Sequence, residues 1–108
     1  MLDGLFGNAT AAKVLVFLAM NREGYAQELA DRLGVSLSQA QSQLQRLERG
    51  GVLVGTPRGR MRFYGFNPRF PIARDLEALL RRAWEFMPER ERERYVARRR
   101  PRAAGKRL

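Results

Sequence analysis

The sequence contains no cysteine and no histidine. No disulfide framework can form, and metal sites built from thiolate or imidazole ligands are excluded. Cysteine nucleophiles and histidine acid–base catalysis are excluded as well, and the carboxylates are scattered over expected helix exteriors without forming an acid–base pair. We therefore expect a protein that is not an enzyme and that carries neither a metal nor a cofactor. The lack of cysteine is also consistent with a cytoplasmic location.

Long hydrophobic runs are missing too. The longest apolar run, from Val14 to Met20, has seven residues, whereas about 20 are needed to span a bilayer. No secretory signal pattern opens the chain, because this run follows Asp3 and has neither a basic flank nor a cleavage site. We therefore expect no membrane partner.

Positive charge is abundant instead. The chain has 108 residues, with 21 Lys and Arg against 11 Asp and Glu, which gives a formal net charge of +10. Such an excess favours a nucleic acid as partner, ahead of an anionic membrane surface. Residues 88–108 hold nine basic and three acidic side chains, whereas residues 1–87 hold 12 and 8. We expect one domain over residues 1–87 and a flexible basic tail over residues 88–108, which either adds nonspecific phosphate contacts or is only a solvated end.

Residues 34–51 carry the clearest helix signals. Ser36 and Gln39 have the spacing of a capping box, and Gly50-Gly51 predicts the end of the helix. One side of this helix is expected to be apolar and buried, through Leu37, Ala40, Leu44 and Leu47. The opposite side is uncharged and rich in groups that can bond base edges in a major groove, and the alternative is a merely solvated polar face. The base-reading candidates are Ser38, Gln39, Gln41, Ser42 and Gln45.

Two helices are expected before this one. Asn8 can cap a nearly continuous apolar helix over residues 9–20, and a second helix is expected from Tyr25 to Leu33. Gly34 ends the second helix two residues before Ser36 begins the next one. Helices joined by so short a turn cross steeply, which is the helix-turn-helix arrangement. Two packed helices without a nucleic-acid role are the alternative.

A basic hairpin is expected after the helix that carries the base-reading candidates. Residues 52–56 and 61–66 have strand composition, and the turn over residues 57–60 holds two arginines. Such a hairpin is a wing that contacts phosphates or the minor groove, and the alternative is an ordinary hairpin with solubilising charges. The candidates for backbone or minor-groove contact are Arg46, Arg49, Arg58, Arg60 and Arg62.

Surplus apolar surface indicates a homodimer. The helix over residues 9–20 is apolar on most sides, and a later helix over residues 72–87 has an apolar arc of roughly 160°, wider than a core-facing helix requires. The alternatives are a central helix buried within its own domain and, for the Trp and Met positions, a ligand pocket in place of packing. The dimer-interface candidates are Val14, Phe17, Leu18, Leu76, Leu79, Leu80, Ala83, Trp84 and Met87.

This order of elements predicts a mainly α fold with a small β-hairpin wing, a winged helix-turn-helix. The sequence also resembles the ArsR/MarR-like winged-helix transcriptional regulators, in particular a small bacterial and archaeal subgroup. The resemblance covers about residues 5–87 and is carried by Leu5-Phe6-Gly7, Glu28-Leu29-Ala30, Leu33-Gly34, Arg46-Leu47-Glu48-Arg49-Gly50-Gly51, Phe63-Tyr64 and Asn67-Pro68.

The resemblance implies a dimeric regulator of transcription, usually a repressor, with residues 36–49 in the major groove of double-stranded DNA and the wing over residues 52–66 beside it. Relatives that sense metals do so through Cys or His, which this sequence lacks. Other relatives are attached to a nucleotidyltransferase domain, which the sequence does not include. The small-molecule or protein effector is therefore unassigned. The alternatives are an adaptor or antitoxin-like interaction module and a nonspecific nucleic-acid-binding protein.

Overall fold

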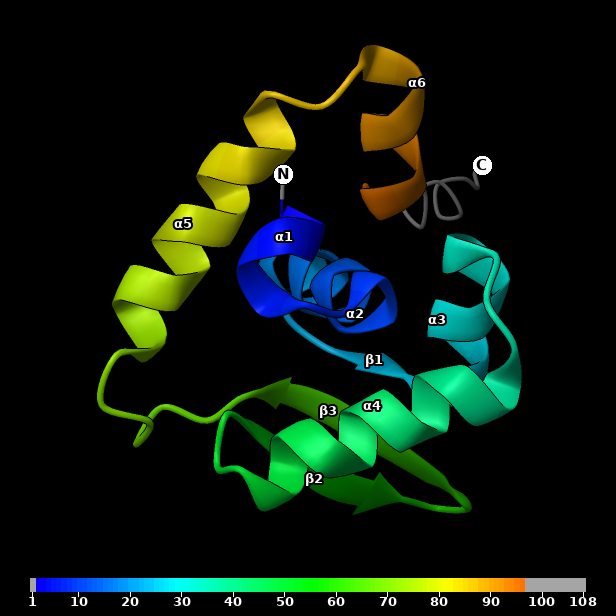
Figure 1. Cartoon of the computed structure of the whole chain (residues 1–108). Coiled ribbons are helices and arrows are strands. Elements are labelled where there is room, and N and C mark those ends of the chain that lie inside the picture. The colour runs from blue at the N-terminus through cyan, green and yellow to red at the C-terminus, as the bar shows by residue number, and fades with distance from the viewer. Residues whose placement is uncertain (1, 97–108) are drawn as a thin grey trace, which may run out of the picture.

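The computed structural model describes residues 2–96 (Figure 1). Its elements are α1 (Leu2–Phe6), α2 (Ala9–Asn21), β1 (Gly24–Tyr25), α3 (Ala26–Leu33), α4 (Leu37–Arg49), β2 (Leu53–Arg58), β3 (Met61–Phe66), α5 (Ala73–Glu85), α6 (Glu89–Arg92) and the 3-10 helix η1 (Glu93–Tyr95). This order confirms the expected mainly α fold with a β-hairpin wing, a winged helix-turn-helix. Within the described residues, no helix is long and apolar enough to cross a membrane.

Helix α2 lies at the centre of the fold, with α1, α3, α4 and α5 around it (Figure 1). The Asn8 side chain accepts a hydrogen bond from the Ala11 N–H at 2.9 Å, which confirms Asn8 as the N-cap. Eight side chains of α2 are buried, from Ala11 to Ala19 with Lys13 as the exception. The core is therefore built around most sides of one helix.

This burial corrects part of the expected dimer interface. Val14 and Phe17 are 0% exposed and Leu18 is 1% exposed within a single chain. They present no surface to a second copy, because their own chain already covers them. The alternative, a central helix buried in its own domain, describes α2.

The helix-turn-helix is formed as expected. Gly34 has φ 69°, a left-handed conformation that favours glycine, and its N–H donates to the Ala30 carbonyl at 3.0 Å. Ala30 and Ala40 are buried at 4% and 0% exposure, and such small side chains let α3 and α4 approach each other. The expected helix does not include Tyr25, which lies in β1 instead. This strand pairs with β3, with Gly24 opposite Tyr64 and Tyr25 opposite Phe63.

The wing is longer than expected. Strand β2 continues to Arg58, which pairs with Met61, so only Gly59 and Arg60 form the turn. Pro57 reads as a turn residue in the sequence, but it lies in β2, an edge strand in the order β1-β3-β2. An edge strand tolerates proline because one side of it forms no ladder hydrogen bonds.

The largest difference from expectation lies after α5. Residues 88–96, here called the strap, fold back over α2 and α3 (Figure 1). Asn21 Nδ2 donates to the Tyr95 carbonyl at 2.6 Å, and Arg32 Nη2 donates to the carbonyls of Arg94 at 2.8 Å and Val96 at 2.7 Å. The expected start of the tail at residue 88 is therefore corrected. Residues 97–108 of the expected tail lie outside the described residues.

Tyr95 ties the strap to the core. It is 2% exposed and belongs to the same buried cluster as Phe17 and Leu29. We predict that Tyr95→Ala lowers the free energy of unfolding by about 3 kcal/mol, because it removes a large buried ring. Denaturation in urea measures this loss. The matched control is Val96→Ala, which changes a 41% exposed side chain. Equal effects of the two substitutions would show that the strap is not part of the core.

Candidate nucleic-acid interface

Helix α4 presents one polar face outward. Ser36 Oγ accepts from the Gln39 N–H at 3.0 Å, and Gln39 Oε1 accepts from the Ser36 N–H at 3.1 Å, so the capping box is confirmed. Ala40 and Leu44 bury the inner side at 0% exposure. The base-reading candidates are all exposed: Ser38, Gln39, Gln41, Ser42 and Gln45. Because the cap already engages its carbonyl oxygen, Gln39 is the weakest of the five.

Leu37 departs from the expected inner side of this helix. It is 39% exposed, because it lies in the first turn of α4 on the flank that faces the wing. There it lines a groove of about 360 Å³ between α4 and the wing. Gln41 and Gln45 continue this wall along α4, since residues four apart share one side of a helix. The opposite wall includes Met61, which is also 39% exposed.

Two of the wing arginines are held by carboxylates. Arg58 donates to both carboxylate oxygens of Glu23, at 2.6 and 3.0 Å, and its guanidinium lies 4.2 Å from the centre of the Phe63 ring. Arg62 pairs with Glu48 of α4 at 2.6 Å. These hydrogen bonds raise the pKa of the Arg58 and Arg62 guanidinium groups above their ordinary value.

The Arg62–Glu48 pair joins the wing to α4. Gly55 of β2 leaves room for it, because a Cβ atom at this position would lie only 2.5 Å from Arg62 Nε. The pair is exposed, so it contributes little to stability. It does fix the direction of the Arg62 side chain and neutralises its charge.

The other candidate arginines differ in their contacts. Arg46 Nε donates to Gln43 Oε1 at 3.2 Å. Arg49 and Arg60 are exposed, and neither forms an ion pair within residues 2–96. Arg60 stands in the turn of the wing, and Arg49 stands in the last turn of α4. A phosphate meets these two cations, and Arg46 as well, without displacing a carboxylate of the described residues.

Sequence reasoning missed four residues of this surface, Leu37, Met61, Glu23 and Glu48. Helical periodicity assigned Leu37 to the core. Met61 was assigned to an aromatic-rich strand, and nothing in the sequence gave it a separate role. The two carboxylates are 35 and 14 positions away from their arginine partners. No local pattern indicates such pairs.

A second exposed surface is apolar and lies on α1 and α5. Of the expected interface residues on α5, Leu80 and Ala83 are buried at 0% and 4% exposure, whereas Leu79 is 43% exposed. Leu76, Trp84 and Met87 are half-buried. Phe86 at 65% and Leu5 at 62% extend the exposed apolar surface around Leu79, although neither was a candidate. We call Leu5, Leu79 and Phe86 the apolar patch.

The fold and its exposed polar helix define the class of this chain, a winged helix-turn-helix protein. No protein-family model and no curated protein matches the sequence. Among solved structures, the chain is similar to the YusO protein from Bacillus subtilis, with 20% identity and a TM-score of 0.49. That alignment covers 74% of this chain but only 64% of YusO, less than two thirds of its length. A likeness of this degree carries no conclusion about function.

The capping box gives a prediction about the stability of α4. Ser36→Ala removes the hydroxyl that caps the helix and is expected to lower the free energy of unfolding by about 1 kcal/mol. Urea denaturation measures the change. Ser38→Ala makes the same chemical change two residues later, at an exposed position, and is expected to stay within about 0.5 kcal/mol of the parent protein. A larger loss for Ser38→Ala than for Ser36→Ala would contradict this assignment of the cap.

Proposed function

We propose that this protein is a sequence-specific regulator of transcription, a repressor, that binds double-stranded DNA as a homodimer in the cytoplasm. The observation that carries the proposal is the uncharged, amide-rich outer face of α4, held outward by a capped helix-turn-helix beside a wing. The resemblance to ArsR/MarR-like regulators and the formal net charge of +10 also support it.

In this proposal α4 enters the major groove. Ser38, Gln41, Ser42 and Gln45 bond base edges, and a good bidentate contact of an amide side chain with adenine discriminates by about 1–3 kcal/mol. Leu37 and Met61 supply the apolar contacts that suit thymine methyl groups. Arg49 and Arg60 bind phosphates, while Arg58 and Arg62 first have to leave their carboxylates.

The proposed homodimer uses the apolar patch on α1 and α5. Leu5, Leu79 and Phe86 lie close together there, and burying them against a second copy removes them from water. A two-fold dimer of this kind binds a palindromic site whose half-sites lie about one helical turn of DNA apart. The same apolar patch also fits the alternative function, an adaptor that binds a different protein.

Selection from random duplexes separates these functions. Purified protein is mixed with the library at two salt concentrations, and the bound duplexes are sequenced. The proposed regulator recovers a palindromic motif and retains a preference of ~10³ or more over random DNA. A nonspecific binder holds every sequence and loses affinity steeply with salt. Recovery of no motif at either salt would favour the adaptor.

The outer polar face of α4 gives a prediction with a matched control. We expect the double substitution Gln41→Ala and Gln45→Ala to reduce the preference for the selected site at least tenfold and to leave nonspecific binding in place, because amides that bond base edges are lost. Competition titrations with selected and random duplexes measure the ratio. Gln43→Ala on the inner flank of α4 is the control. Unchanged preference in the double variant would show that another surface reads the bases.

The internal ion pairs give a further prediction. Glu48→Gln leaves Arg62 without a neutralising carboxylate, so affinity for all duplexes should rise, with a salt slope steeper by up to about 0.9. Glu89→Gln is the control, because it makes the same change of charge on the strap, away from α4 and the wing (Figure 1). Fluorescence anisotropy at several salt concentrations measures both slopes. Equal changes in the two variants would indicate an effect of net charge alone.

A further inference from the structure

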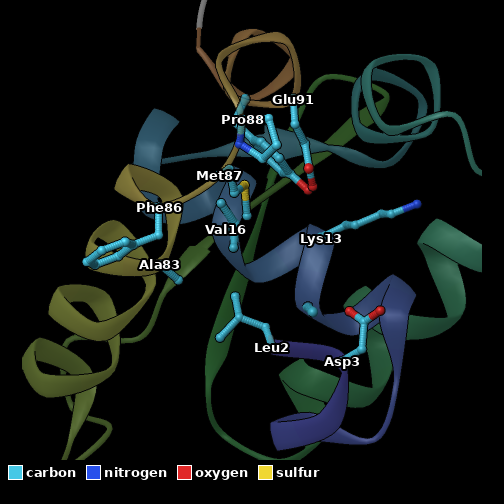
Figure 2. A pocket seen from close by; sticks show the side chains of 11 residues that line it. Leu2, Asp3, Lys13, Val16, Ala83, Phe86, Met87, Pro88 and Glu91 are labelled. Atoms are coloured by element: carbon cyan, nitrogen blue, oxygen red, sulfur yellow. The ribbon is translucent and has the colours of Figure 1, made fainter.

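A cavity of about 270 Å³ lies between α1, α2, the end of α5 and the strap (Figure 2). Its inner wall is apolar and includes Leu2, Val16 and Met87. A volume near the lower end of small-molecule sites, about 300 Å³, accommodates one aromatic ring or a short alkyl chain. This cavity lies away from α4 and the wing, so it does not belong to the proposed DNA interface.

The mouth of the cavity is acidic, in a chain with a net charge of +10. Figure 2 shows the Glu91 carboxylate reaching in from the strap and the Asp3 carboxylate reaching in from α1 on the opposite side. Lys13 also lines the cavity, but its side chain extends away from both carboxylates and forms no ion pair within residues 2–96. Two carboxylates thus face the same opening without a cation held between them by the described residues.

Tyr95 supplies an independent observation. Its side chain lines the cavity and is 2% exposed, yet its hydroxyl has no hydrogen-bond partner among residues 2–96. Burial, followed by the charges of Glu91 and Asp3, raises the pKa of Tyr95 to about 12, so the group is a neutral phenol near pH 7. The hydroxyl is therefore available to bond a polar group that enters the cavity.

From these features we propose that the cavity binds a small molecule with an apolar body and a protonated amine. The body packs against Leu2, Val16 and Met87. The ammonium group lies between the carboxylates of Asp3 and Glu91 and donates a hydrogen bond to the Tyr95 hydroxyl. A carboxylic acid of the same shape is disfavoured, because its charge would face two carboxylates and only one ammonium group, that of Lys13. This site is independent of the proposed DNA binding.

Ligand binding at this site is linked to the position of the strap. Glu91 and Tyr95 lie on the strap, whereas Leu2 and Asp3 lie on α1, so one ligand contacts both parts. Trp84, the only tryptophan of the chain, donates its Nε1–H to the Arg92 carbonyl at 3.1 Å. The Arg92 guanidinium also lies over the Trp84 ring, 5.2 Å from its centre. Trp84 fluorescence therefore reports on the strap.

The test uses three ligands with the same phenylethyl body. Phenethylamine, 2-phenylethanol and 3-phenylpropanoate are each titrated into the full chain without DNA, and Trp84 fluorescence and the midpoint of thermal unfolding are recorded. We expect a saturable response to the amine, at least tenfold weaker binding of the alcohol and no binding of the acid. Hexylamine checks an alkyl body. Equal binding of the three phenylethyl compounds, or no binding of either amine at millimolar concentration, would overturn the proposal.

Substitutions locate the bound amine. Glu91→Gln and Tyr95→Phe are each expected to weaken amine binding at least fivefold without lowering the thermal midpoint, because neither group is hydrogen-bonded within the described residues. Glu89→Gln is the control, since it removes the same charge from the strap at a residue that does not line the cavity. Equal losses of amine affinity for Glu91→Gln and Glu89→Gln would show that the effect comes from the overall charge of the strap. That result would contradict the proposed binding site.

Discussion

The fold depends on the burial of α2. A helix with apolar side chains on most of its surface is stable in water only when other elements cover it on most sides. This chain provides that cover by itself, with α3 and α4 on one part of α2, α5 on another, and α1 and the strap closing the remainder (Figure 1). The strap is thus part of the hydrophobic core, although its composition is that of a solvated segment. Tyr95 is the side chain through which it joins.

The same constraint fixes which side of α4 faces outward. Ala40 and Leu44 are drawn into the core against α2, so the serines and glutamines lie opposite. The positive charge around this face is less available than its arginine count indicates, because carboxylates hold Arg58 and Arg62. In the proposed function, α4 supplies selectivity. The affinity comes from Arg49 and Arg60, and from Arg58 or Arg62 when a phosphate displaces its carboxylate partner.

Much of the domain could be predicted from local sequence. Asn8, the Ser36–Gln39 capping box and Gly34 each mark a boundary through an interaction within four residues, and the wing follows from its strand composition. The strap could not be predicted, because alternating Glu and Arg give no periodic apolar face and a single tyrosine carries the contact with the hydrophobic core. The partners of Arg58 and Arg62 are long-range. The apolar surface of α2 and α5 indicates a dimer in the sequence, but the strap and α1 help to cover it. Among the expected interface residues, all of which lie in the described part of the chain, Leu79 is the exposed one, and it belongs to the apolar patch.

In the proposed function, the outer face of α4 reads DNA. The most direct measurement is an NMR titration of the isotope-labelled protein with its selected duplex. We expect the largest amide and side-chain shifts at Ser38, Gln41, Ser42 and Gln45 and at the wing turn around Arg60, with Tyr95 and the strap nearly unchanged. Shifts concentrated on Leu79 and Phe86 of α5, with α4 unperturbed, would contradict it.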